Sequence, residues 1–362
     1  MKKTRVLLLI LVSVPIFLIL LFLGLNFVKQ WQDPLYNPGE KDFAVLDTAA
    51  ITKIFLADKK GNQVLLERGS NGLWTLNKKY EAHKDVIQEV MYTLFNMTVR
   101  SPVPLSMRDN VIREMAAHAV KVEIYARVYA IDLFGINLFP YEKRIRTFYV
   151  GYSTKDQTGS FFLMEGSENP YILHIPGFMG FINSRFSPFE RDWRSHKVFE
   201  AQLADIKKVE VFYPDFKENS FTIVQQNHCF EVRSVEGQVL PNIDTVTVIA
   251  FLNQFVDVRF ESIIDDASPA KLDSIKQLIP FCKISLEKND GQKQSIDLIR
   301  IKAPEGSTNV EGKLIEYDPE YLWGVLPSGE VVMTQYFVFG PLMKKLDEFK
   351  IKKLNLKEVK IN

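Results

Sequence analysis

The chain has 362 residues, 45 of them basic and 44 acidic, and 46% of its residues are hydrophobic. This length suits a membrane segment plus two domains of ordinary size. The balanced charge argues against nucleic acid as a partner. The two cysteines, Cys229 and Cys282, are too few for a disulfide framework and lack the spacing of a zinc site. Their strand-like neighbours favour two buried thiols over a bridge or a reactive pair.

The N-terminus is predicted to cross a membrane. Residues 6–25 read VLLLILVSVPIFLILLFLGL, an uncharged stretch about as long as the hydrocarbon core requires. Lys2, Lys3 and Arg5 precede it and Lys29 follows, so the positive-inside rule places the N-terminus in the cytoplasm and the remainder in the periplasm. We expect a single-pass inner-membrane protein. A cleaved signal peptide is the alternative, but LGLNFVKQW lacks the small residues of a cleavage site.

After the anchor, the sequence shows one plan twice. The stretches that begin at Ile51 and Ile206 each predict three short strands, with Trp74 opposite Phe230. Each copy continues with a helix that has one apolar face, a second helix and further strands, and ends in a strand that runs into an apolar helix. The predicted apolar helix faces comprise Val86, Val90, Leu94 and Met97 in the first copy and Val246, Ile249, Leu252 and Phe255 in the second.

These patterns predict the α+β class, with an N-terminal transmembrane helix followed by two tandem repeats of antiparallel strands with packed helices. If the copies share one fold, their strand order should be the same, with Trp74 and Phe230 at equivalent core positions. The predicted boundaries are 1–28 for the cytoplasmic tip and anchor, 29–46 for a tether, 47–194 and 195–348 for the repeats, and 349–362 for a basic C-terminal tail.

The segment FERDWRSHKVFE, residues 189–200, stands where the first repeat ends and the second begins. We interpret Arg191, Asp192, Trp193 and Arg194 as a structural joint, with Trp193 buried between the repeats and an Arg reaching a carboxylate or carbonyl nearby. An acid/base cluster of Asp192, Arg194 and His196 is the alternative. Neighbouring residues of an extended segment point to opposite faces, which favours the joint.

No phosphate-loop, dinucleotide-binding, zinc-protease or α/β-hydrolase motif occurs in the sequence. Carboxylates are frequent, but their spacing is typical of solvated loops. We therefore expect no catalytic, cofactor-binding or metal-binding residue, and no enzymatic activity.

The stretch VYAIDLFGINLFPYEKR, residues 128–144, carries more large apolar residues than a strand connection needs, whereas the second copy has EKNDGQKQS at that place. The stretch is either an extension of the domain core or a hydrophobic tip that contacts a membrane or a partner. The candidate contact residues are Leu133, Phe134, Ile136, Leu138 and Phe139.

Four stretches carry a family resemblance: FYVG, GSFFLMEGSENPYILHIPGFMGFINSRF, RDWRSHKVFE and IKKVEVFYPDFKENSFTIV. They resemble a family of membrane-anchored proteins, common in Bacteroidota, that is catalogued as a domain of unknown function and is often encoded beside gliding-type ABC transporter components. The resemblance covers most of the chain after the anchor. It implies an extracytoplasmic α+β repeat and an envelope protein as partner, and it supplies no catalytic residue.

Anchor and resemblance together indicate a periplasmic interaction or accessory module for an envelope transport or gliding-type ABC transporter complex. Its expected partners are the inner membrane, through residues 6–25, and another envelope protein. A carrier of a lipid or other apolar ligand, and a hydrolase with a carboxylate site outside known motifs, remain open as alternatives. A large apolar cavity would favour the carrier, and a cleft with carboxylates of shifted pKa would favour the hydrolase.

Overall fold

The computed structural model describes residues 14–22, 24–25, 39–133, 136–226, 229–264 and 267–351. The chain divides into two compact units, with the boundary after Ser195. Residues 14–22 and 24–25 are helical, and no helix within the described ranges is both long and apolar enough to span a membrane. The rest of the predicted anchor, residues 29–38 of the tether and most of the basic tail lie outside these ranges.

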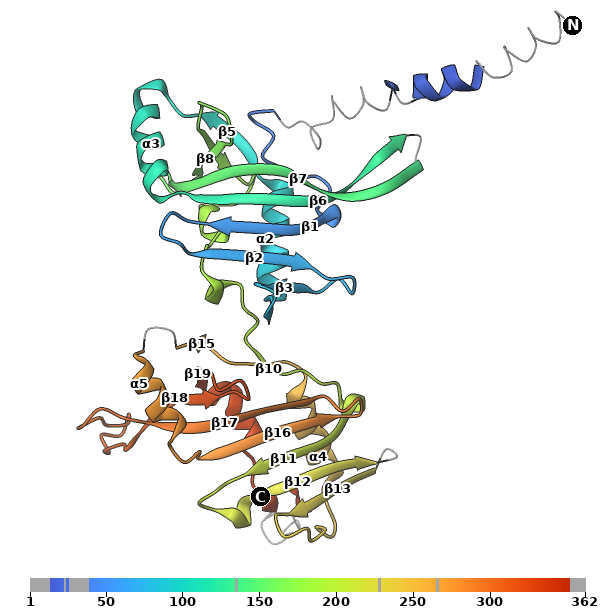
Figure 1. The fold of residues 1–362 in the computed structure, drawn as a ribbon. Coiled ribbons are helices and arrows are strands. Elements are labelled where there is room, and N and C mark those ends of the chain that lie inside the picture. Colours follow the sequence, from blue (N-terminus) through green and yellow to red (C-terminus); the bar gives the residue numbers. More distant parts are fainter. Residues whose placement is uncertain are drawn as a thin grey trace, which may run out of the picture. The chain divides into compact units, whose positions relative to one another are not determined.

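The first unit contains a nine-stranded antiparallel sheet in the order β4-β3-β2-β1-β6-β7-β8-β9-β5 (Figure 1). Its strands are β1 (Ile51–Ala57), β2 (Gln63–Arg68), β3 (Trp74–Leu76), β4 (Tyr80–Glu81), β5 (Thr98–Pro102), β6 (Val120–Leu133), β7 (Ile136–Ser153), β8 (Ser160–Met164) and β9 (Tyr171–His174). Its helices are α2 (Lys84–Asn96) and α3 (Leu105–His118), with short 3₁₀ helices η1 (Thr48–Ala50), η2 (Asn183–Arg185) and η3 (Glu190–Asp192).

The second unit contains an eight-stranded antiparallel sheet in the order β13-β12-β11-β16-β17-β18-β19-β15, and a separate pair of strands, β10 and β14. Its strands are β10 (Lys197–Phe199), β11 (Ile206–Phe212), β12 (Phe221–Gln226), β13 (Cys229–Ser234), β14 (Val258–Arg259), β15 (Ser262–Ile263), β16 (Cys282–Lys288), β17 (Lys293–Lys302), β18 (Tyr317–Val325) and β19 (Val331–Gln335). Its helices are α4 (Thr245–Leu252), α5 (Pro269–Lys276) and α6 (Tyr336–Phe339), with 3₁₀ helices η4 (Leu203–Asp205), η5 (Lys217–Asn219), η6 (Asn253–Phe255), η7 (Gly340–Leu342) and η8 (Leu346–Phe349).

The two large sheets have the same strand order, as the repeat hypothesis requires. Without β4, the first sheet reads β3-β2-β1-β6-β7-β8-β9-β5, which matches the second sheet strand for strand. Even an irregularity is shared, because the pairing register shifts directly after Ile51 on β1 and directly after Ile206 on β11. The prediction of two copies of one α+β plan is confirmed.

Trp74 and Phe230 stand at equivalent places in these sheets. Matching ladders cross the first three strands, Ile54–Leu66–Leu76 in the first unit and Val209–Ile223–Val232 in the second. Trp74 lies two residues before Leu76, and Phe230 lies two residues before Val232. Trp74 is buried, whereas Phe230 is only partly buried against its core. The prediction that the two residues occupy equivalent positions in the sheets is confirmed. The prediction that both positions lie in the core is correct for Trp74 but not for Phe230.

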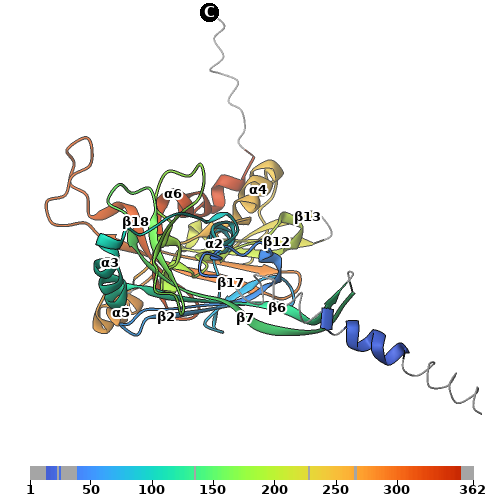
Figure 2. The same cartoon turned by 90° about the horizontal axis from the view of Figure 1, so that it is seen from above.

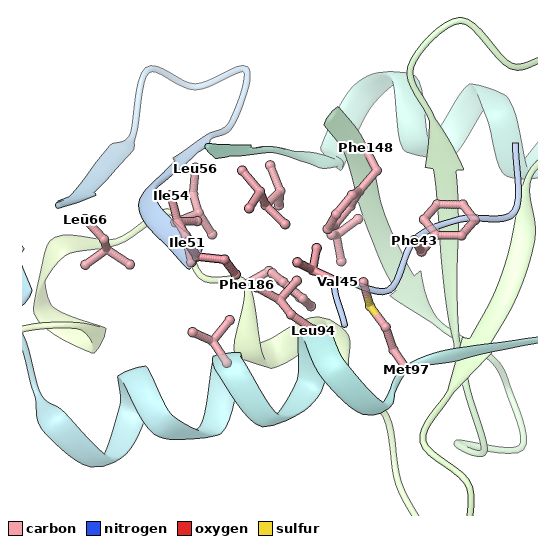
Figure 3. Packing of buried hydrophobic residues seen from close by; sticks show 14 of the residues in the cluster. Phe43, Val45, Ile51, Ile54, Leu56, Leu66, Leu94, Met97, Phe148 and Phe186 are labelled. Carbon is pink, nitrogen blue, oxygen red and sulfur yellow. The ribbon is translucent and has the colours of Figure 1, made fainter. Parts of the chain in front are cut away.

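The core of the first unit lies between α2 and the sheet. Figure 3 shows Leu94 and Met97, at the C-terminal end of α2, beside Ile51 and Phe148 from the strands. Each of these side chains is at most 1% exposed. The predicted apolar face is confirmed for Val90, Leu94 and Met97, with Val86 packed at its margin.

The apolar face of α4 is phased differently from the prediction. Val246 is exposed, and the buried residues are Val248, Phe251, Leu252 and Phe255. Asp244 is the reason, because its carboxylate caps the helix by accepting from the backbone N–H groups of Val246 and Thr247. The cap places Val246 in the first turn, on the side away from the core.

An apolar helix was also expected after the last strand of each copy. The second unit has one, α6, but in the first unit the chain after β9 forms turns before η2. Gly177 and Gly180 have φ values of 78° and 145°, which a helix does not accommodate. The helix prediction is therefore wrong for the first copy.

Candidate functional site

The segment that follows η2 ends in a buried aromatic residue. The Trp193 side chain is 1% exposed and belongs to the core cluster of the first unit, together with Ile182 and Phe186. Its indole Nε1 donates to the carbonyl oxygen of Ser187 at 2.7 Å. Trp193 is therefore buried within the core of the first unit, whereas the prediction placed it between the repeats.

Backbone hydrogen bonds fasten this segment to the start of α2. His83 N donates to Trp193 O at 2.7 Å, and Ser195 N donates to Glu81 O at 2.9 Å. The guanidinium carbon of Arg194 lies 3.9 Å from the centre of the Tyr80 ring, a distance typical of a cation–π contact. All of these partners lie within the first unit.

The end of the second unit repeats this arrangement. Asp244 N donates to Phe349 O at 2.8 Å, and Ile351 N donates to Asn242 O at 3.2 Å. Phe349 is fully buried. RDWRS (191–195) and DEFKI (347–351) are therefore equivalent closing segments, one at the end of each repeat. Phe349, one residue beyond the predicted boundary at residue 348, is part of the second core.

The repeats also begin at equivalent residues, outside the predicted start at residue 47. Val45 N donates to Leu94 O at 2.8 Å, and Ala201 N donates to Phe255 O at 2.9 Å. Phe43 and Phe199, each two residues earlier, are both buried. The repeat therefore runs from Phe43 to Ser195 and from Phe199 to Ile351.

A cavity of about 420 Å³ lies beside the first closing segment, lined by residues that include His118, Ser187, Arg191 and Asp192. Although Ser, His and Asp all line it, the Ser187 hydroxyl donates directly to the Asp192 carboxylate. Phe189 N also donates to Ser187 Oγ, at 3.2 Å. These hydrogen bonds stabilise a turn. The Ser187 hydroxyl donates to a carboxylate, whereas in a catalytic triad it would donate to a histidine base.

A second cavity, of about 500 Å³, lies between the chain before β1 and the end of α2. Arg146 lines it, is 5% exposed, and donates to Ile145 O at 2.8 Å. Lys41, Asp42 and Asp47 also line the cavity. Apolar lining stands beside these charged groups, and it comes from Ala44, Val45, Leu46, Met97 and Val99. The cavity therefore presents both kinds of surface to a ligand.

The sheet face of the first unit turned away from α2 carries a charged network. Glu123 accepts from Lys121 Nζ at 2.7 Å, Tyr125 Oη at 2.8 Å and Arg144 at 3.2 Å. Burial on its own would raise the pKa of Glu123, but these hydrogen bonds and the charges of Lys121 and Arg144 lower it below its usual value. The spacing of residues 121, 123 and 125 alternates with buried apolar residues, and this pattern was the signal that could have revealed the network.

The carboxyl chemistry gives no support to a general acid. Hydrogen bonds and nearby cations lower the pKa of six carboxyl groups against the cost of burial: Asp58, Glu123, Asp156, Asp244, Glu287 and Glu348. A glycosidase-type acid needs a raised pKa. The same residues contain no cluster of three or more His, Cys, Asp or Glu side chains placed to hold a metal ion.

The cysteines are both free, and the prediction of two buried thiols is half right. Cys282 is buried, and Cys229 is exposed on β13, the edge strand of the second sheet. Burial raises the pKa of the Cys282 thiol to about 12 against the lowering effect of its hydrogen bond with Tyr213. Cys229 was misassigned because the outward-facing positions of an edge strand reach water.

The apolar stretch at residues 128–144 forms the outer part of a long hairpin. β6 and β7 pair from Val120↔Val150 out to Leu133↔Ile136, whereas β1 pairs with β6 only as far as Ala126. The two strands therefore continue as a ribbon beyond the sheet, as Figures 1 and 2 show. Val128, near the base of the ribbon, is buried in the core.

Beyond that base, apolar side chains face solvent. The exposed fractions are 46% for Leu138, 70% for Phe139 and 45% for Tyr141. Phe134 lies outside the described residues, and for Leu133 and Ile136 the backbone alone is described. The interpretation of the stretch as an extension of the core is therefore wrong for Leu138 and Phe139. Those two residues are exposed apolar side chains on the ribbon. We refer to Leu138, Phe139 and Tyr141 as the hairpin tip.

Comparisons of the chain with protein-family models, curated proteins and solved structures found no match.

Proposed function

We propose that the chain is a single-pass inner-membrane protein whose two α+β units lie in the periplasm and bind another envelope protein. The observation that carries the proposal is the N-terminal helix, where Phe17 is 65% exposed and Leu20 is 62% exposed. Both belong to the uncharged stretch 6–25, whose apolar side chains need a covering that water does not provide. The resemblance to membrane-anchored proteins encoded beside ABC transporter components supports a role as an accessory to such a complex.

The surfaces of the two units support binding rather than catalysis. Exposed apolar side chains follow the last strand of each repeat: Met179 is 95% exposed, with Phe178 and Phe181 also exposed beside it, and Phe337 is 89% exposed. Each unit therefore offers an exposed apolar position of its own to a partner. No catalytic role is proposed for any residue.

Site-specific crosslinking in intact membranes tests this function. A photoreactive amino acid at Met179 or Phe337 should give a discrete adduct with another envelope protein, identified by mass spectrometry. The matched control is Lys59, an exposed polar position in the turn after β1, which should give no such adduct. Loss of both adducts, or adducts that contain only this chain, would contradict the proposal.

A further inference from the structure

The side chains of the hairpin tip are exposed to solvent and lie in a stretch of sequence without charged residues. Between Asp132 and Glu142 the sequence has no ionisable residue other than Tyr141. Within this stretch Leu138, Phe139 and Tyr141 hold their side chains in solvent. A fully buried Phe or Leu side chain is stabilised by about 1.5–3 kcal/mol relative to an exposed one, so the hairpin tip gains free energy from any apolar covering.

The repeat comparison shows that the fold does not require this extension. The corresponding strands of the second unit, β16 and β17, are joined by the short turn Asn289–Gln292, where Asp290 Oδ1 accepts from Gln292 N at 2.9 Å. The second sheet is complete with that polar turn. The ribbon in the first unit is therefore an extension that the shared fold of the two repeats does not require.

The chain joins the first unit at the end of the sheet from which the ribbon projects. Ile51, the first residue of β1, pairs with Ala126, where β6 leaves the sheet to form the ribbon. Near the first described residues of this unit, Glu40 Oε2 accepts from Tyr171 Oη at 3.4 Å. Tyr171 is the first residue of β9, and the β8–β9 turn lies at this same end of the sheet.

Chain length then limits how far this end can lie from the anchor. Residues 26–38 separate the apolar stretch from Gly39, and a fully extended chain of that length spans at most about 45 Å. Phe139 lies between the pairs Tyr129↔Pro140 and Ile131↔Leu138, which is about 14 Å along the ribbon from Ala126 at the usual rise of a strand. The tip can therefore reach the bilayer that holds the anchor.

The chemistry of the tip fits a lipid interface. Tyr129 and Tyr141 stand on the two strands, behind Phe139, and tyrosine is enriched where a protein passes from hydrocarbon to headgroups.

From these observations we propose that the hairpin tip docks into the periplasmic leaflet of the membrane that anchors the chain. The docking rests on the proposed function, because it requires the anchor to hold the first unit near the bilayer. It would give the first unit two attachments to one surface, the anchor and the tip, and so restrict its rotation about the tether.

Depth-dependent fluorescence quenching in the full chain tests the docking. The background variant is Cys229→Ser, because Cys229 is the exposed cysteine and Cys282 is 0% exposed. A bimane label is placed at Phe139→Cys, and the protein is reconstituted in phosphatidylethanolamine and phosphatidylglycerol vesicles that contain spin-labelled lipid. Two matched labels serve as references: Leu18→Cys in the anchor and Phe337→Cys, an equally apolar exposed site in the second unit.

The expected result is that the labels at residues 139 and 18 lose fluorescence to spin-labelled lipid, with a blue shift of their emission, and that the label at residue 337 keeps its fluorescence. Quenching at residue 18 without quenching at residue 139 would overturn the docking and leave the anchor intact. Quenching at neither position would overturn both. Quenching at residue 139 but not at residue 18 would contradict the anchor and overturn the docking as proposed, because the tip would then bind lipid without an anchor in the same membrane.

Discussion

At the scale of single residues, Trp193 explains why FERDWRSHKVFE contains so many functional groups. The charged residues flank a turn in water, and from this turn the side chain of Trp193 is inserted in the core of the first unit. Phe349 does the same for the second repeat. Chemical diversity here follows from a closing role, and the sequence signal for that role was the Trp or Phe followed by a basic residue, Arg194 or Lys350.

Truncation of either closing aromatic residue should destabilise the unit to which it belongs. We expect Trp193→Ala and Phe349→Ala each to lower the free energy of unfolding by about 3–5 kcal/mol, because each removes a buried aromatic side chain and leaves a cavity. Urea unfolding of the purified chain measures the loss. Phe189→Ala is the control, since Phe189 lies in the same segment and is 41% exposed.

The closing role would be disproved by a Trp193→Ala protein that unfolds at the wild-type urea concentration. His196 separates this role from the acid/base alternative. Its ring stacks on Phe260 with the ring centres 4.5 Å apart. A stable His196→Ala protein without activity in cells would support the acid/base cluster instead.

At the scale of elements, strands were easier to predict than helix ends. Alternation of apolar and polar residues gave β1, β11 and their neighbours, because one face of each strand packs on a helix. The phase of α4 was missed because it depends on the cap at Asp244, which outweighs a short run of apolar residues. The burial of Phe43 and Phe349 could not be predicted from the local pattern, because both residues pack against aromatic rings far along the chain, Phe148 and Phe221 respectively.

The charged face formed by β6, β7 and the end of β8 should make stability depend on pH. Because the folded pKa of Glu123 is lowered, its contribution to stability is complete above the unfolded value of 4.5 and is lost as the pH falls through the folded pKa. We expect Glu123→Gln to lower the free energy of unfolding by about 1–2 kcal/mol at pH 7. The difference from wild type should shrink as the pH falls below 4.5.

Urea unfolding at a series of pH values from 7 to 3 measures this difference. Glu311→Gln is the matched control, because Glu311 pairs only with Lys313 on an exposed loop and its side chain is 69% exposed. A Glu123→Gln difference that stays constant over the whole pH range would show that the carboxylate charge contributes nothing.

At the scale of the whole molecule, the repeat was accessible from sequence because duplicated cores retain their apolar spacing. The exposure of the hairpin tip could not be predicted from the sequence, because an apolar stretch has the same composition whether its side chains are buried in a core or exposed to solvent. The structure separates the two outcomes within one stretch, with Val128 buried and Phe139 exposed. Membrane insertion and orientation remain predictions from the apolar stretch 6–25 and its flanking charges.

A reporter fusion tests that orientation directly. Lys2, Lys3 and Arg5 lie before the apolar stretch and Lys29 lies after it, so the N-terminus should stay in the cytoplasm. Alkaline phosphatase, which folds only outside the cytoplasm, should therefore be active when fused after Asn362. In the matched control, Gln replaces all three basic residues before the stretch, which removes the charge bias and should lower phosphatase activity. An inactive phosphatase, together with an active cytoplasmic reporter at the same point, would place both units in the cytoplasm and remove the basis of the proposed envelope partner.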